Sequence, residues 1–188
     1  MARQPRIISR GARLFWGCAI ILMVVLLCVA SLPSLRSQYV SPSSHEVRPD
    51  RLEARMLDLL NADRAAASSL RETNGRAHPL LWDARLAAAA RAHSEDMARN
   101  GYFSHQGSDG TMPFTRVSRA GVQGRGTAEN IAKTSDVFQA ESLFMNEPKF
   151  QHNHRGNILN PNYTHVGIGI VIGPDGSLYI TQDFAELR

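Results

Sequence analysis

Two histidines and two glutamates lie between residues 104 and 159, in short segments whose neighbours are typical of turns and element ends. His105 follows a serine, Glu129 opens Glu-Asn-Ile-Ala, Glu147 precedes a proline, and His154 opens His-Arg-Gly-Asn-Ile-Leu. Neutral imidazoles are common ligands of zinc and similar ions. A carboxylate among apolar residues needs a hydrogen-bond partner or a site, and such loops often carry site residues. The set predicts a site, but its spacing names no reaction.

Each of these residues also has a purely structural interpretation. His105 is equally consistent with a solvated or capping residue, and Glu147 with the end of a helix. His152 and His154 lie two positions apart, which also fits one exposed and one packed imidazole. The sequence contains no His-Glu-x-x-His, paired cysteines or Gly-x-Ser-x-Gly. The residues alone therefore leave a metal site, another binding site and a structural role open.

The N-terminus determines where such a site would operate. Residues 1–13 hold four arginines and no acid, and residues 14–35 hold no charge. About 20 apolar residues span a bilayer, and the basic side stays inside. We expect a cytoplasmic flank at 1–13, a transmembrane signal-anchor at 14–35, a Ser/Pro linker at 36–50 and one exported domain at 51–188. The apolar run exceeds the about 7–15 residues of a signal-peptide core, which favours an anchor over a cleaved signal peptide.

Charge and cysteine content restrict the partners of the exported domain. The chain has a net charge of +4, but five of its 21 basic residues and none of its 17 acidic residues precede position 37. The domain is therefore nearly neutral, which gives no support for nucleic-acid binding. Cys18 and Cys28 both lie in the apolar run, so the domain has no disulfide. We expect a monomer whose partners are the membrane and an extracytoplasmic ligand.

The first half of the domain predicts two helices. From Asp50, a suitable N-cap, apolar residues recur at helical spacing up to Ala65. Residues 66–78 are polar and predict a loop. A second helix begins after Asp83 and ends at Gly101, because glycine tolerates the left-handed conformation of helix ends.

The second half predicts another helix and most of a sheet. Ser135 or Asp136 caps the helix, and a short strand is expected near residues 130–132. Apolar residues alternate over 166–172 and 178–183, on both sides of a Gly-Pro-Asp-Gly turn, which predicts a hairpin. Helices followed by a hairpin indicate an α+β domain with an antiparallel sheet.

The order of short motifs along the domain resembles a known family. The motifs are Pro79-Leu80-Leu81-Trp82-Asp83, His93-Ser94, Ser104-His105, Glu129-Asn130-Ile131-Ala132, His154-Arg155-x-Asn157-Ile158-Leu159 and Tyr179-x-Thr181-Gln182. Over about residues 52–186 the chain resembles the CAP superfamily, the cysteine-rich secretory, antigen 5 and pathogenesis-related 1 proteins with an SCP-like domain. It is most similar to the short bacterial type.

The resemblance implies a fold and a set of site residues. The expected fold is a three-layer α-β-α sandwich around a central antiparallel sheet, with a cleft lined by two histidines and two glutamates. His105 and His154 match the family histidines, which makes them the expected metal ligands. Glu129 and Glu147 match the supporting glutamates. The segment ahead of His154 is longer than usual, so His152 is an additional candidate.

The resemblance leaves three functions open. The leading hypothesis is an anchored or secreted extracytoplasmic binding module, whose cleft holds a divalent metal such as zinc and a lipid, envelope glycan or protein. The second is a metal-assisted hydrolase with Glu129 or Glu147 as general base. The third is lipid or sterol binding or export. Carboxylates that accept hydrogen bonds from ring N–H groups would orient the imidazoles in any of them. Whether the protein is an enzyme stays open, and we favour the hypothesis that it is not.

Overall fold

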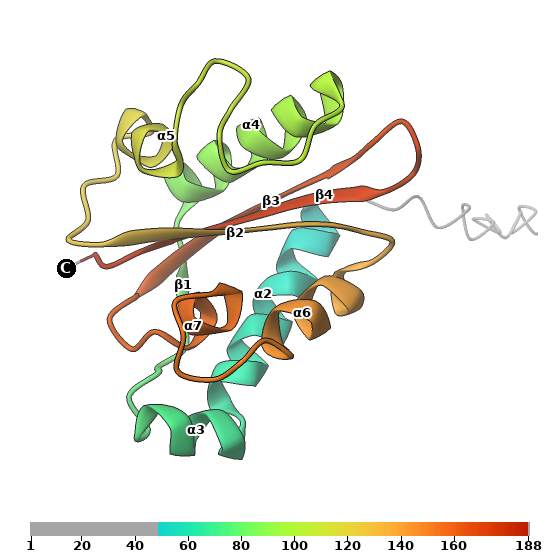
Figure 1. The fold of residues 1–188 in the computed structure, drawn as a ribbon. Helices are drawn as coiled ribbons and strands as arrows, with labels where there is room; N and C mark the ends of the chain where they lie inside the picture. The colour runs from blue at the N-terminus through green and yellow to red at the C-terminus, as the bar shows by residue number, and fades with distance from the viewer. Residues whose placement is uncertain (1–48, 188) are drawn as a thin grey trace, which may run out of the picture. The chain divides into compact units, whose positions relative to one another are not determined.

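The computed structural model describes residues 49–187, which form one domain with helices on both faces of a four-stranded sheet (Figure 1). The expected cytoplasmic flank at 1–13, the membrane segment at 14–35 and all but the last two residues of the linker at 36–50 lie outside these residues. Within residues 49–187, no helix has the length and apolar character that crossing a bilayer requires.

The sheet has the strand order β1-β3-β4-β2. Its strands are β1 (Leu81–Trp82), β2 (Thr127–Thr134), β3 (His165–Ile172) and β4 (Leu178–Ala185). The three long strands pair antiparallel, as the predicted hairpin and early strand require. The two-residue β1 pairs parallel with β3, because it belongs to the segment that crosses from one helical layer to the other. β2 is left as an edge strand.

The helices form one layer on each side of the sheet. They are α2 (Pro49–Ala65), α3 (Ala67–Thr73), α4 (Ala84–Asn100), α5 (Pro113–Arg119), α6 (Val137–Met145) and α7 (His154–Leu159). α4 and α5 cover one face, and α2, α6 and α7 cover the other (Figure 1). This arrangement confirms the expected α-β-α sandwich.

Two local predictions need correction. Asp50 is not an N-cap, because α2 already begins at Pro49 and places Asp50 in its first turn. The predicted loop at 66–78 contains α3, which ends where Asn74 adopts a left-handed φ of 53°. The caps at Asp83 and Asp136 are confirmed, since each carboxylate accepts a backbone N–H of the helix that follows.

α4 packs directly on the backbone of β3. A Cβ at Gly167 would overlap the backbone nitrogen of Ala87, and one at Gly169 would overlap that of Arg91. The hydroxyl of Ser94 donates to the carbonyl of Gly169 at 2.9 Å. These two glycines therefore fix the distance between α4 and the sheet.

A buried arginine ties the opposite layer together. Arg64 of α2 is fully buried and donates to the carbonyls of His78, Ile158, Asn160 and Tyr163. Burial lowers the pKa of this guanidinium to about 10. Since Ile158 belongs to α7, this arginine holds the helix that carries His154.

A buried glutamate in the same layer, beside the half-buried Asp63 of α2, makes stability depend on pH. Burial, and then the charge of Asp63, raises the pKa of Glu141 to about 8. The folded chain therefore binds this proton more tightly than the unfolded chain, whose glutamate has a pKa of 4.5. The proton's stabilising effect is complete below about pH 4.5 and is lost as the pH rises toward 8. Glu141→Gln is expected to raise the free energy of unfolding near pH 8 by roughly 2–4 kcal/mol, and to change it little near pH 4.

Urea unfolding of the full chain in detergent micelles at both pH values tests this. Glu95→Gln is the matched control, since Glu95 lies on the exposed side of α4 with a side chain 54% exposed. An equal effect of Glu141→Gln at the two pH values would contradict the assignment.

Candidate functional site

His105 is held by a buried carboxylate. It lies between α4 and α5, and its Nδ1 is 2.7 Å from Oε1 of Glu129 on β2. The side chain of Glu129 is only 1% exposed, and its Oε2 accepts from Arg116 of α5 at 2.5 Å. Both oxygens of Glu129 are thus engaged. A carboxylate at Nδ1 selects the tautomer in which Nε2 carries the free lone pair.

A third histidine contacts the segment that carries His105. His93 is buried on α4, and its Nε2 is 3.0 Å from the carbonyl of Ser104, the residue before His105. Nε2 also lies 3.9 Å from Oε1 of Glu129. Burial lowers the pKa of His93, so the neutral ring donates to Ser104 and fixes the segment that carries His105.

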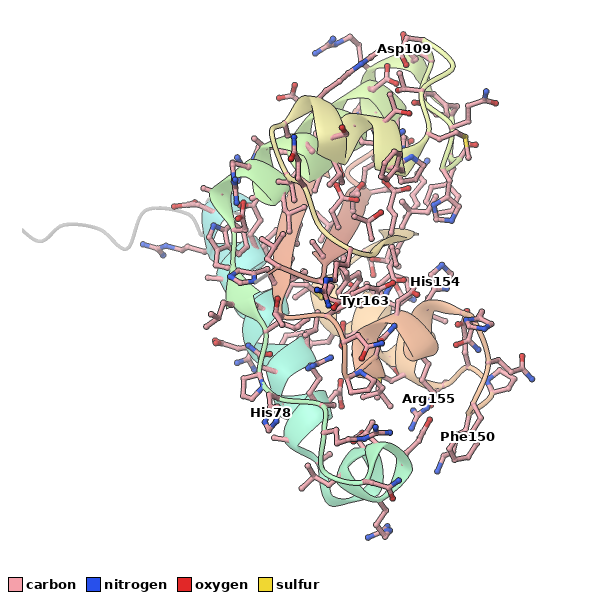
Figure 2. The ribbon with its side chains drawn as sticks, turned by 90° about the vertical axis from the view of Figure 1, so that its left-hand side faces the viewer. His78, Asp109, Phe150, His154, Arg155 and Tyr163 are labelled. Atoms are coloured by element: carbon pink, nitrogen blue, oxygen red, sulfur yellow. The ribbon has the colours of Figure 1, made fainter. Side chains whose placement is uncertain are left out.

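His154 is held in the same way by Glu147. It is the first residue of α7, and its Nδ1 is 2.7 Å from Oε1 of Glu147. The other oxygen of Glu147 accepts the backbone N–H of His154 at 2.8 Å, a favourable place for a negative charge. The ring also packs on Phe144, with centroids 4.8 Å apart. Figure 2 shows His154 on the side of α7 toward the sheet and Arg155 on the side toward α3.

Both histidines line one cleft. It has a volume of about 450 Å³, and its walls include Phe103, Met112 and Ile131 beside His105 and His154. The two imidazoles reach it from opposite faces of the sheet. They are connected to adjacent residues of β2, and successive side chains of a strand point to opposite faces.

Two adjacent residues of β2 provide this alternation. Glu129 accepts from His105 on one face, and the amide of Asn130 donates to the carbonyl of His154 at 3.2 Å on the other. Asn157 of α7 donates to the side-chain oxygen of Asn130 at 2.8 Å. The edge strand thus connects both histidines.

Each of the two glutamates contacts the Nδ1 atom of its histidine. Over residues 49–187, no group of three or more His, Cys, Asp or Glu side chains is placed to hold a metal ion together. His105 and His154 are the two imidazoles that line this cleft.

His152 lies away from this cleft. It is exposed and lines a separate pocket with Phe150 and Glu72. The segment before α7 folds back on itself, since the amide of Asn153 donates to the carbonyl of Pro148 at 2.9 Å. The longer loop thus directs His152 toward α3.

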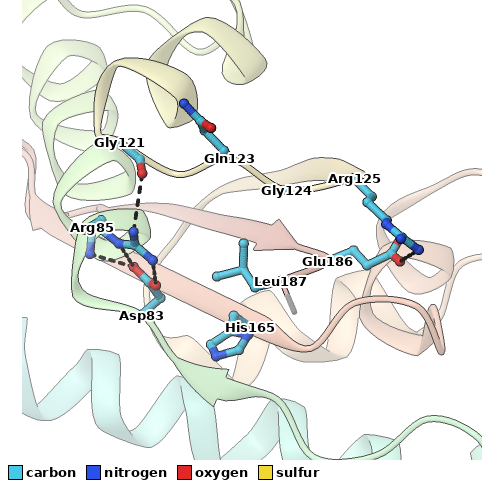
Figure 3. Close-up of a pocket in the computed structure, with 9 residues that line it drawn as sticks. All are labelled: Asp83, Arg85, Gly121, Gln123, Gly124, Arg125, His165, Glu186 and Leu187. Atoms are coloured by element: carbon cyan, nitrogen blue, oxygen red, sulfur yellow. Dashed lines mark hydrogen bonds and ion pairs between the residues drawn. The ribbon is translucent and has the colours of Figure 1, made fainter.

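A larger cavity lies elsewhere in the described residues. It has a volume of about 670 Å³ and contains none of the predicted site residues (Figure 3). Arg85 pairs with Asp83 at 2.6 Å, and Arg125 lies 4.0 Å from Glu186. Because each cation there has an acidic partner, this groove shows no free charge for a ligand, and the cleft between the two histidines is the better candidate.

The comparisons with known proteins agree with this architecture. Residues 57–184 match the sequence profile of the cysteine-rich secretory protein family, CAP. The chain belongs to the CAP family. It is 35% identical over 133 residues to the uncharacterized protein YkwD of Bacillus subtilis, and 34% identical over 135 residues to the membrane protein YlbC of the same organism. These matches cover 70% and 71% of this chain, but only 46% and 34% of the relatives.

Solved structures show the same CAP fold. An extracellular protein containing an SCP domain from Bacillus anthracis has a TM-score of 0.60 and 29% identity, over 74% of this chain and 41% of that one. An outer surface protein from Borrelia burgdorferi has a TM-score of 0.55 and 17% identity, over 71% of this chain and 94% of that one. The second likeness concerns the fold alone.

Sequence reasoning missed Arg116 and Asp183, which both lie beside Glu129 in this CAP domain. Arg116 resembles any surface arginine of a short helix. Asp183 had a detectable signal in the sequence, because it ends the stretch 178–183 that predicts a strand. Every residue of this strand, β4, is buried, and an acid in a buried strand needs an explanation.

Proposed function

We propose that the chain is an extracytoplasmic CAP binding module whose ligand occupies the cleft between His105 and His154. The observation that carries the proposal is the pair of matched imidazole–carboxylate contacts, each 2.7 Å long, on one cleft. The charge-free run at 14–35 supports a place outside the cytoplasm, anchored or secreted. So do relatives described as an extracellular protein and a membrane protein.

The donor chemistry of the cleft fits a divalent metal such as zinc. His105 and His154 would supply two imidazole nitrogens, and Glu129 and Glu147 would orient them, as carboxylates do for zinc-binding histidines. Two protein ligands leave further positions to water or to a ligand. A bound ion would supply attraction for an anionic or carbonyl oxygen of that ligand.

The hydrogen bonds of the two glutamates favour ligand binding over hydrolysis. A general base must reach the water that it activates. Glu129 is buried and gives one oxygen to His105 and the other to Arg116, while Glu147 gives both oxygens to His154. Neither carboxylate has an oxygen without a donor.

Lipid binding is the second candidate, because the cleft has an apolar wall. Phe103 and Met112 are 50% and 51% exposed beside the imidazoles. Exposed apolar side chains that gather at a cleft support a ligand with an apolar part.

Removing either imidazole is expected to weaken zinc binding. His105→Ala and His154→Ala should each lower zinc affinity at least about tenfold, since even orienting residues contribute that much. Calorimetric titration of the full chain in detergent micelles measures the affinity, and circular dichroism verifies the fold. His152→Ala is the control, because His152 lies outside the cleft. Equal affinity in all variants would contradict the metal site, and turnover of a peptide, ester or glycan that a chelator abolishes would establish the hydrolase instead.

A further inference from the structure

A second acid lies directly beside Glu129. Asp183 of β4 is its cross-strand partner in the antiparallel register, so both side chains are on the same face of the sheet. Asp183 is fully buried, and the side chain of Glu129 is 1% exposed. Two carboxyl groups therefore share an interior site beneath His105.

The nearby donors that form hydrogen bonds do so with other acceptors, and the Nε of Arg116 is buried without a partner. Arg116 donates to Glu129 and to the carbonyl of Thr111, and Nε2 of His93 lies 3.0 Å from the carbonyl of Ser104. Among the residues that the structure describes, neither oxygen of Asp183 has a hydrogen-bond donor. An ionised carboxylate in that position would be a buried charge without compensation.

The charges of the neighbouring groups also indicate that one of the two carboxyl groups is protonated. Arg116 carries the positive charge of this cluster, His93 is neutral, and two ionised carboxylates would leave an excess negative charge in the interior. Like charges this close cannot both persist in a medium of low polarity. One proton shared between the two carboxyl groups removes the excess and supplies the missing hydrogen bond.

We propose that Asp183 is a neutral carboxylic acid at physiological pH that donates its proton to Glu129, and that it acts as a positioning residue for His105. Glu129 then accepts from Asp183, from Arg116 and from the Nδ1–H of His105. The lone pair of His105 Nε2 is thereby kept available to the cleft. The effect on ligand binding rests on the proposed function, whereas the location of the proton does not.

The electrostatics of the cluster agree with this geometry. Burial, and then the charge of Glu129, raises the pKa of Asp183 well above its ordinary value, and Arg116 offsets only part of the rise. The charged groups that act on Asp183 come from β2 and α5, so the shift belongs to the packed site as a whole.

Carbon-13 NMR of the carboxyl groups in the full chain, in detergent micelles without zinc, tests the location of the proton. The Asp183 signal is expected to keep the shift of a protonated acid through about pH 7. Asp175 is the control, because its bond to Lys133 lowers its pKa to about 2. Titration of Asp183 near the ordinary value of about 3.9 would overturn the proposal.

Two substitutions separate positioning from a purely structural role. Asp183→Asn keeps an N–H donor toward Glu129, so the Nδ1–H tautomer of His105, read from nitrogen-15 shifts, should be that of the wild type. Asp183→Ala removes the donor and should shift the tautomer ratio and lower zinc affinity about tenfold. Identical His105 spectra in both variants would overturn the positioning role. Because the tautomer is read without metal, failure of zinc binding in the wild type would leave this test intact.

Discussion

Replacing Arg116 with methionine is expected to lower the free energy of unfolding by about 3–5 kcal/mol, because it leaves a buried carboxylate without its cation. The side chain of Arg116 is 11% exposed, and its guanidinium contacts Glu129 at 2.5 Å. It also donates to the carbonyl of Thr111, so the bond to the segment that precedes α5 is lost as well. Chemical denaturation of the full chain in detergent micelles at about pH 7 measures the loss.

Arg119 of the same helix is the matched control. Its side chain is 66% exposed and lies 3.3 Å from the exposed Asp109, so Arg119→Met should cost less than about 1 kcal/mol. The double variant Arg116→Met with Glu129→Gln should recover part of the loss, because the glutamine carries no charge. A loss that the second substitution leaves unchanged would show that packing of the arginine, and not its charge, is responsible.

Gly169→Ala is expected to destabilise the domain by at least about 3 kcal/mol through overpacking. The new methyl group would overlap the backbone of Ala90 and Arg91, which cannot rotate away as a side chain would. α4 must then move off the sheet, and the bond from Ser94 to the Gly169 carbonyl is lost. Because α4 also carries His93, the His105 segment should shift too.

Thermal unfolding of the full chain in detergent micelles measures this effect. Gly126→Ala is the control, since a Cβ there meets only the ring of Tyr163 at an ordinary 3.8 Å, and it should cost less than about 1 kcal/mol. Comparable losses for the two substitutions would mean that α4 adjusts to the extra methyl group.

Features that depend on neighbouring residues were predictable from the sequence. Asp83 and Asp136 cap helices within three residues of themselves, and the alternation over 166–172 specifies β3 without reference to the rest of the chain. α3 was missed because a short helix that ends at a left-handed asparagine has the polar composition of a loop.

The contacts of the site depend on which residues of distant segments lie opposite one another, and local sequence patterns do not encode that pairing. Resemblance identified His105 and His154, and the structure places both on one cleft. No local pattern, however, indicates that Asp183 lies opposite Glu129, or that Arg116 reaches it from α5. The position of His152 likewise follows from how the loop folds.

The alternation of Glu129 and Asn130 on β2 has a consequence for selectivity. Since one residue contacts His105 and the next contacts the carbonyl of His154 across the sheet, the relative placement of the two imidazoles depends on the packing of the sandwich. If the cleft binds the proposed ligand, interior packing would limit which ligands can contact both rings. Substitutions in the core, remote from the cleft surface, would then alter which ligands fit.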